Sequence, residues 1–348
     1  KLRLLLLVPW LGLSVPVLSQ YNSPESVEHD PVGDRYFVSN LGDGTIKQRD
    51  QAGIVTPFAS VSPDPYGLEI LGDTLYACSG GRVKGYLLAD GSQVFNLNTG
   101  GGFLNGITTD GHFLYVTDFS GQQIFRVEPS TATFTTWVAS TGGTPNGIVY
   151  EPVNDVLLVA YWGPGAIVRG YDRSTASITG SVSTGVGSID GITIECHGLV
   201  VISSWSPNRI SRFEWGILSP QFEDLMVPGV SQPADIDFDT VHDRICIPSG
   251  GNDQVILFDL ADCATAVPGT PVSEAFTVSL TADGRSLRVP GPPPAGAPTP
   301  EVASYRVLDA TGRLLADGRP QATVAVPACT GVIIVQVDGL GVRRLVVP

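Results

Sequence analysis

The sequence is short of charge and of helical patterning, and each shortage excludes a class of protein. Only 16% of the residues are charged whereas 43% are apolar, a composition that excludes disorder as the default state and allows a large core. No stretch of a dozen residues repeats apolar positions at helical spacing, which disfavours a parallel sheet with crossover helices. Together these features predict an all-β fold.

Positive charge is scarce as well. The chain carries 20 Lys and Arg residues against 34 Asp and Glu residues, which gives a net charge of -14. Nucleic acid and anionic membrane surfaces are disfavoured as partners because this charge would repel them. Cations and small molecules remain compatible with it.

Cysteines are few and widely spaced, so they predict no disulfide framework. None of the five lies in a C-x-x-C pair, and they are Cys78, Cys196, Cys246, Cys263 and Cys329. Two interpretations stay open: a Cys246–Cys263 bridge near the end of the repeat region, and buried free thiols. Cys78 follows the residues Leu75-Tyr76-Ala77 and is interpreted as a buried thiol.

Residues 1–19 have the pattern of a secretory signal peptide. Lys1 and Arg3 precede the apolar run Leu4–Val17, and small residues precede a predicted cut ahead of Gln20. The alternative is a membrane anchor, but the run is shorter than the ~20 residues that span a bilayer. No later segment looks transmembrane. We therefore expect a protein that is secreted or held at the cell surface after the signal peptide is removed.

A short pattern recurs six times along the chain. In its fullest form, Pro145-Asn146-Gly147-Ile148, a mostly polar residue that we call the anchor is followed by glycine and an aliphatic residue. Successive anchors lie 39 to 44 residues apart, which is the period of a four-stranded propeller blade. The six anchors are Glu25, Tyr66, Asn105, Asn146, Asp190 and Ala234. The repeats predict a six-bladed β-propeller over residues 20–268.

Each repeat contains several short runs rich in β-branched and aromatic residues. In the third repeat they follow the anchor strand at His112–Phe119, Gln122–Val127 and Thr133–Val138, with Gly and Pro between runs. The last repeat shows only three clear strands. We expect residues 21–24 or residues 264–268 to supply the fourth strand and close the ring.

The composition changes after Ala261, where a Pro- and Gly-rich segment separates further strand-like runs. About eighty residues of alternating strands predict a small C-terminal β-sandwich over residues 269–348. Tyr305–Leu315, Gly331–Val337 and Arg343–Val347 resemble the C-terminal sorting domain of proteins exported by the type IX secretion system. This resemblance implies the secretion machinery as a partner, and the alternative is an ordinary structural or adhesive sandwich.

Four anchors carry side-chain oxygens, and the propeller architecture predicts that they converge. The innermost strand of every blade starts near the central channel, so equivalent positions face a common axis. The four are Glu25, Asn105, Asn146 and Asp190. Carboxylate and amide oxygens suit a hard cation, Ca²⁺ more readily than Mg²⁺, with another divalent cation as an alternative. No anchor is His or Cys, which disfavours zinc at this position.

Turn chemistry alone is the competing explanation of the anchors. Asn-Gly and Asp-Gly are ordinary turn dipeptides and occur between the strands of many β proteins. A pure turn requirement would not select Glu25, however, and the anchor varies in type while the glycine recurs. The pattern therefore favours metal binding.

Residues 25–260 resemble the calcium-dependent propeller hydrolases of the senescence marker protein and gluconolactonase family, with diisopropylfluorophosphatases and paraoxonases as more distant relatives. In that family the ligands are a Glu of the first blade, an Asn before Gly and an Asp before Gly, and Glu25, Asn146 and Asp190 match them in order and blade. Asn105 matches an Asn at the metal or the substrate. The resemblance implies hydrolysis of a lactone or related ester, with Asp190 as ligand and as base or nucleophile.

The sequence also departs from the family pattern. Ser26-Val27 follows the first anchor where the family has Gly-Pro, and Gly106 follows Asn105 where the family has Asp-Gly. Phe103-Leu104 stands where an Arg commonly holds sugar-acid substrates, which disfavours aldonolactones. None of the four histidines lies near an anchor in the pattern, so no second base is predicted.

Aromatic residues end several second strands, on the face where the anchors begin. They predict an aromatic rim over the metal, typical of a small-molecule site, formed by Tyr66, Phe119, Tyr161, Trp162 and Trp205. The alternative is that the two tryptophans pack between blades. Asp118 and Asp235 are predicted to contact the metal ligands and orient them without binding the metal themselves.

The function predicted from the sequence is a secreted Ca²⁺-dependent hydrolase of a lactone or related ester, acting on a small molecule. The alternative is a non-catalytic propeller whose ion holds the channel together while the loop face binds a protein or glycan. Neither substrate identity nor oligomeric state follows from the sequence.

Overall fold

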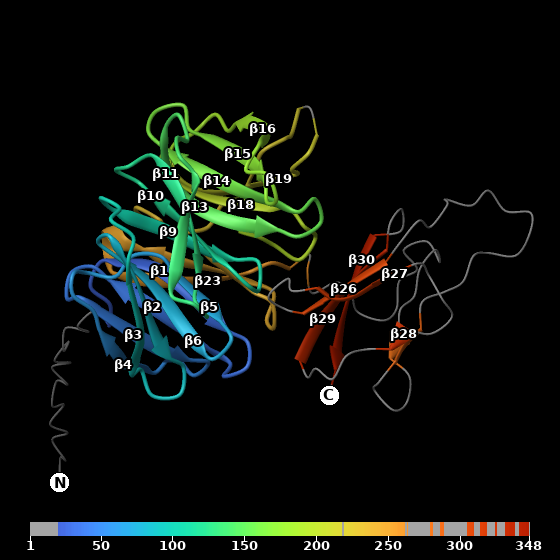
Figure 1. The fold of residues 1–348 in the computed structure, drawn as a ribbon, viewed down its shortest axis with the longest axis horizontal. Helices are drawn as coiled ribbons and strands as arrows, with labels where there is room; N and C mark the ends of the chain where they lie inside the picture. Colours follow the sequence, from blue (N-terminus) through green and yellow to red (C-terminus); the bar gives the residue numbers. More distant parts are fainter. Residues whose placement is uncertain are drawn as a thin grey trace, which may run out of the picture.

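The structure is a computed structural model that describes residues 20–217, 219–261 and 263, together with seven strands between residues 279 and 347. The signal peptide predicted for residues 1–19 lies outside the described residues. Six antiparallel sheets follow one another along residues 24–259 as propeller blades (Figure 1). The innermost strand of each blade contacts that of the next, and the sixth contacts the first. The predicted all-β, six-bladed propeller is confirmed.

The first three blades each have four strands, ordered from the channel outward as in the sequence. They are β1 (Pro24–Asp30), β2 (Arg35–Asn40), β3 (Thr45–Asp50) and β4 (Val55–Ser60); β5 (Leu68–Leu71), β6 (Thr74–Ser79), β7 (Arg82–Leu87) and β8 (Gln93–Asn98); β9 (Leu104–Thr109), β10 (Leu114–Asp118), β11 (Gln123–Glu128) and β12 (Thr133–Val138).

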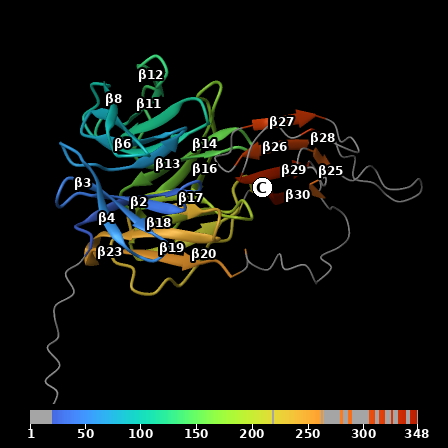
Figure 2. The same ribbon diagram turned by 90° about the horizontal axis from the view of Figure 1, so that it is seen from below.

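The remaining blades follow the same order, and the view from below shows their strands side by side (Figure 2). They are β13 (Thr144–Glu151), β14 (Val156–Trp162), β15 (Ile167–Asp172) and β16 (Ile178–Ser183); β17 (Gly187–Ile194), β18 (Val200–Ser206), β19 (Asn208–Phe213) and β20 (Glu223–Asp224); β21 (Asp237–Asp239), β22 (Arg244–Ser249) and β23 (Gln254–Asp259). Residues Gly250–Asn252 form a 3-10 turn.

The core lies between adjacent blades, because both faces of each blade are covered by a neighbour. Phe37 of the first blade packs with Leu68 and Leu75 of the second, and Leu158 of the fourth packs with Ile202 of the fifth. These side chains are at most 2% exposed, and each contributes about 1.5–3 kcal/mol when it leaves water. The β-rich runs of the sequence therefore form both the blades and the contacts between them.

The last blade closes the ring with three strands in the described part of the chain. Tyr21 precedes β1 outside any strand and packs in a cluster with Val27, Val38 and Cys246, between the first and sixth blades. Backbone contact joins the same two blades, since Asp235 N–H donates to the Glu25 carbonyl at 2.8 Å. Residues 21–24 thus do not supply the predicted fourth strand, and residues 264–268 lie outside the described residues.

The anchors lie within the innermost strands or directly before them, so their Asn-Gly and Asp-Gly pairs are not turns. At four anchors the strand pairing slips by one residue, so that the anchor and its successor share one partner. Such a bulge changes the direction of the side chains around it. The Asn-Gly and Asp-Gly pairs therefore form β-bulges and not turns.

The glycine after the anchor is required by the next blade. A Cβ at this position would lie 2.3–2.7 Å from the carbonyl oxygen of the following anchor, closer than any real Cβ contact, and the glycines concerned are Gly67, Gly106, Gly147 and Gly191. The first and last repeats carry Ser26 and Asp235 instead. These two side chains meet at the closing junction, where Ser26 Oγ donates to Asp235 Oδ2 at 2.9 Å.

The described residues of the tail form seven strands. They pair into a sheet of β24 (Ser279–Leu280), β25 (Ser286–Arg288) and β28 (Val324–Ala325), and a sheet of β27 (Leu314–Gly318), β26 (Tyr305–Asp309), β29 (Gly331–Val337) and β30 (Gly341–Val347). The residues between these strands lie outside the described residues. The β-sandwich and the sorting domain therefore remain predictions from the sequence.

Within the described residues, no helix has the length and apolar character needed to cross a membrane.

Replacing Gly106 with Ala is expected to destabilise the propeller by about 1–3 kcal/mol, because the new methyl group would overlap the Asn146 carbonyl oxygen at 2.4 Å. Gly180→Ala is the matched control, since a Cβ there lies 3.7 Å from the Trp215 ring and fits. Urea unfolding followed by tryptophan fluorescence measures both. Equal stability of the two variants would contradict the close approach of the inner strands.

Candidate functional site

The four oxygen-bearing anchors are buried at the start of the inner strands. Glu25, Asn105, Asn146 and Asp190 are between 1% and 9% exposed. Asn146 and Asp190 are in direct contact, since Asn146 Nδ2 donates to Asp190 Oδ1 at 3.0 Å and to the Ile189 carbonyl at 3.3 Å. Asn105 contacts the second blade through its backbone carbonyl oxygen, which accepts the Gly67 N–H at 3.0 Å.

The amide oxygen of Asn146 is a buried acceptor that lacks a hydrogen-bond partner among the described residues. Burying an acceptor without a partner costs about 1–3 kcal/mol, so native structures rarely leave one. The oxygen lies on a side chain whose amide nitrogen is already bound to Asp190. A cation beside it would supply the missing partner, and an amide oxygen is a ligand that Ca²⁺ accepts.

Negative charge accumulates around this oxygen. Burial raises the pKa of Asp190 to about 7, although hydrogen bonds from Asn146 and Trp205 act in the opposite direction. Burial, and then repulsion by Asp190 and Asp235, raise the pKa of Glu25 well above its ordinary value. Burial likewise raises the pKa of Asp235, against a hydrogen bond from Ser26 and with repulsion from Asp190 and Asp237. In the described part of the chain no Lys or Arg contributes to these shifts, so the residues present fit a divalent cation.

A second ring of side chains, polar except for Val149 of the fourth blade, lies three residues after the anchors and was not predicted from the sequence. Its acidic members are Glu28, Glu69 and Asp237, in the adjacent blades one, two and six. Glu28 Oε1 accepts the Ile70 N–H at 3.0 Å, and Asp237 Oδ2 accepts the His29 N–H at 2.9 Å. Each side chain thus caps the inner strand of the next blade. The signal was present in the sequence, because the same 39–44-residue period aligns them.

The second ring adds further charge to the channel. Burial raises the pKa of Glu28 and of Glu69 well above the ordinary value, and repulsion within the ring, with Asp237 acting on both, adds to it. Threonine takes this position in the third blade, where Thr108 Oγ1 accepts the Tyr150 N–H at 3.2 Å. A hydroxyl makes the same cap without charge. The acids are therefore not needed for capping alone.

A row of aromatic rings includes four of the five residues predicted for the rim, Tyr66, Phe119, Trp162 and Trp205. Adjacent rings are in contact from the second blade to the fifth, with centroid distances of 4.6, 5.3, 6.2 and 5.0 Å along the row Tyr66, Phe103, Phe119, Trp162 and Trp205. All five are half-buried, so each ring keeps an accessible part. Trp205 lies at the anchors, because its indole N–H lowers the pKa of Asp190 while donating to the Pro233 carbonyl at 3.0 Å.

Two members of the rim differ from the prediction. Tyr161 is only 4% exposed and its hydroxyl pairs with that of Tyr171 at 2.7 Å, so it belongs to the core between blades. Phe103 takes its place in the rim. Strand alternation explains the change, since Tyr161 and Trp162 are neighbours in β14 and point to opposite faces.

Asp118 and Asp235 have different roles. Asp118 does not bond the anchors but accepts the backbone N–H groups of Gly102 and Phe103 at 3.1 and 3.0 Å, which fixes the loop that carries the Phe103 ring. Although burial opposes it, hydrogen bonds led by that of Gln123 keep the pKa of Asp118 below its ordinary value. Asp235 lies beside the anchors and acts on the pKa of Glu25.

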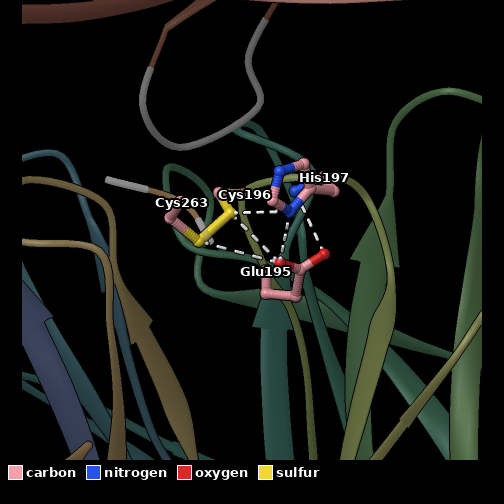
Figure 3. Close-up of side chains that lie close together, drawn as sticks. All are labelled: Glu195, Cys196, His197 and Cys263. Carbon is pink, nitrogen blue, oxygen red and sulfur yellow. Dashed lines mark hydrogen bonds and ion pairs between the residues drawn. A yellow bond between two sulfur atoms is a disulfide. The ribbon is translucent and has the colours of Figure 1, made fainter. Parts of the chain in front are cut away.

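The disulfide joins Cys196 to Cys263, and the Cys246–Cys263 pairing is wrong (Figure 3). Cys246 is a buried free thiol in β22 that faces the first blade, whereas Cys263 returns to the turn after β17. Cys78 is a buried free thiol, as predicted. Glu195 and His197 lie against the disulfide, with 3.2 Å between Glu195 Oε2 and His197 Nδ1. Both sulfurs are bonded, so this cluster offers no thiolate for a metal.

The sequence matches no protein-family model and no curated protein. Solved structures match the fold. They include hydrazine synthase of Kuenenia stuttgartiensis (TM-score 0.55, 14% identity, 74% of this chain and 82% of that one) and virginiamycin B lyase of Staphylococcus aureus (0.51, 14%, 68% and 84%). A structural genomics protein of unknown function from Bacteroides thetaiotaomicron has TM-score 0.56 at 13% identity over 68% of both chains. These similarities support the propeller and no shared activity.

Without divalent cations, we expect the free energy of unfolding to fall as pH rises from about 4 to 7. The raised pKa of Asp190, about 7, means that the folded chain binds more protons than the unfolded chain in this range, and stability then falls with pH. Each pKa unit corresponds to about 1.4 kcal/mol. Thermal unfolding in a chelator at pH 5 and pH 8 measures the change.

Asp190→Asn should reduce this loss between pH 5 and pH 8. Asp172→Asn is the control, because hydrogen bonds led by that of Ser174 lower the pKa of exposed Asp172 to about 2, outside the tested range. A wild-type profile in the Asp190→Asn variant would show that Asp190 does not carry the effect.

Proposed function

We propose that the protein is a Ca²⁺-dependent hydrolase of a small lactone or related ester. The observation that carries the proposal is the buried, unpartnered Asn146 oxygen beside Asp190, in a channel where carboxylates accumulate. Glu25, Asn105, Asn146 and Asp190 would hold the ion, as the resemblance to the gluconolactonase family implies. When bound, the ion would polarise the substrate carbonyl.

Asp190 is the residue of this chain best placed to exchange a proton with water or substrate. A pKa near neutrality suits a general base or acid, and Asp190 combines such a pKa with the anchor position. Asn146 orients its carboxylate through the 3.0 Å hydrogen bond, and Trp205 lies beside it. A bound cation would lower this pKa and keep the carboxylate ionised.

The rim indicates the class of substrate. Five half-buried rings next to the anchors favour a small molecule with an apolar or aromatic part. Phe103 stands in contact with Tyr66 where the family has an arginine, which supports an uncharged substrate in place of a sugar acid. The proposal includes export, with the protein secreted or held at the cell surface. This part of the proposal rests on the sequence of residues 1–19 and of the tail.

A non-catalytic propeller with a structural ion is the second candidate. It is favoured by the capping role of Glu28 and Asp237, because these channel carboxylates already hold adjacent blades together. An ion at the anchors would extend the same role, and the rim would then bind a protein or glycan. Calcium binding is common to both candidates and turnover separates them.

Calcium binding is expected to depend on Asn146. Asn146→Ala removes the buried acceptor and should weaken Ca²⁺ affinity at least about tenfold, the effect of about 1.4 kcal/mol. Terbium titration is a suitable measurement, because Trp205 lies beside Asp190 and would sensitise the ion's luminescence. Asn96→Ala, at an exposed position of β8, is the control. Unchanged Ca²⁺ affinity in the Asn146→Ala variant would show that the ion binds at another site.

Hydrolysis is expected to depend on Asp190. On a panel of aryl esters and lactones, Asp190→Asn should lower kcat at least about 10²-fold even with Ca²⁺ raised to saturation, the usual scale for a lost acid or base. Asp172→Asn serves as the matched control in an exposed turn. Full activity of the Asp190→Asn enzyme would remove this residue from the mechanism. A wild-type protein that Ca²⁺ stabilises but that turns over none of the panel would support the binding module.

A further inference from the structure

A cluster of imidazole and carboxylate groups lies where the ring closes, at the strand ends away from the anchors. His29 is near the end of β1 and Asp34 lies in the turn before β2, both in the first blade. Asp239 ends β21 and His242 lies in the turn before β22, both in the sixth blade. The cluster therefore combines residues about 200 positions apart in the sequence.

Three of these residues, His29, Asp34 and His242, each offer one ligand atom, and these atoms all lie within 4.8 Å of one another. Asp34 Oδ1 is 3.9 Å from His29 Nε2 and 3.6 Å from His242 Nδ1. Ligand atoms around a tetrahedral zinc ion with bonds of about 2.0–2.1 Å are about 3.4 Å apart. Small side-chain movements would therefore bring these groups to ligand distance.

The Nε2 atom of His29 is a buried polar atom without a hydrogen-bond partner among the described residues. The side chain is 2% exposed, and Nε2 makes no hydrogen bond although it faces Asp239 Oδ1 at 3.4 Å and Asp34 Oδ1 at 3.9 Å. The ring has little freedom to turn away, because it packs on Tyr36 and its backbone N–H is bound to Asp237. A buried imidazole nitrogen directed at a second imidazole and two carboxylates is a metal-ligand arrangement.

Asp239 orients the two imidazoles. Its Oδ1 accepts the backbone N–H groups of Val241 and His242 at 2.9 Å, which fixes the turn, and its Oδ2 lies 2.9 Å from His242 Nδ1. The Tyr36 hydroxyl donates to the same oxygen. Asp239 thus faces the same two ring nitrogens that would bind a metal, with its Oδ1 3.4 Å from His29 Nε2. A metal would displace the proton between His242 Nδ1 and Asp239, and the Asp239 carboxylate would then be a further ligand. Gln51 Nε2 holds Asp34 Oδ1 at 2.9 Å from the other side.

The corresponding acids of the first and third blades pair with arginine, and that of the fifth blade, Glu195, contacts the single histidine His197. Asp30 also accepts two backbone N–H groups of its turn, but its free oxygen pairs with Arg35 at 3.0 Å. Asp110 likewise caps its turn and pairs with Arg173 at 3.2 Å. Two histidines replace the arginine only at the junction between the first blade and the three-stranded last blade, within the described residues.

We propose that His29, Asp34 and His242 form a zinc-type transition-metal site that ties the last blade to the first, with the Asp239 carboxylate as a further ligand. Imidazole nitrogens favour Zn²⁺ and similar ions over Ca²⁺, so this site is chemically distinct from the oxygen-bearing anchors. It supplies a cross-link at the junction where the sheet of the last blade has three strands. The proposal is independent of the proposed hydrolase activity.

The test is zinc binding by the full chain, stripped of metal and then saturated with Ca²⁺ so that the anchors are filled. Competition with a chromophoric chelator should show one tight zinc per chain, and zinc should raise Tm. His242→Ala should lower zinc affinity at least about 100-fold, since even loss of a positioning partner costs 10–100-fold. His242 is partly exposed, so this variant is expected to fold, and its Tm without metal checks this.

Two controls make the result specific. His112→Ala removes an exposed histidine of another blade, and His197→Ala removes the histidine beside the disulfide. Both should keep the tight zinc, and crystals grown with zinc should show anomalous density between His29 and His242. The proposal is overturned if wild type and His242→Ala bind zinc equally, or if the tight zinc is lost in His197→Ala instead. A cluster that alters only the pH dependence of stability and binds no zinc would be an ion-pair group, which also overturns it.

Discussion

The structure depends on the close approach of successive inner strands around the channel. At four junctions the backbone of one blade lies so near the anchor of the next that only glycine fits, and Gly106 against the Asn146 carbonyl is typical. This contact fixes where every inner strand begins. It also brings the side chains of Asn146 and Asp190 into contact, because each of these anchors directly precedes such a glycine. Packing and site geometry therefore have one origin.

The same contact has an electrostatic consequence. Inner strands have one edge without a neighbouring strand, and side-chain oxygens from the preceding blade cap their N–H groups, as Glu28 does for Ile70. Where the cap is a carboxylate, charge accumulates in a buried channel and raises the pKa of its neighbours. Proton uptake or a divalent cation can offset that charge. The anchors and the second ring thus form one electrostatic unit, with the Asn146 oxygen as its unpartnered acceptor.

Much of this could be predicted from the sequence. The six repeats at a 39–44-residue period indicated the number of blades, and the run Thr133–Val138 has the bounds of β12. The anchors were found because the repeat aligns them. The second ring shares that period but was missed, since its members vary among acids, threonines and Val149, and no glycine marks them. Phe103 was missed for another reason: whether it or Tyr161 joins the rim depends on loop geometry held by Asp118.

The sequence by itself determined the local features: strand lengths, the repeat, and the residue types at its inner positions. These follow from alternation and turn chemistry, which act between near neighbours. Only the tertiary structure decided which distant residues meet. Cys196 pairs with Cys263 across 67 residues, and His29 lies with His242 because the ring closes between the first and last blades. No periodic pattern encodes such pairs, since each occurs once, at a junction that exists only after all six blades have packed.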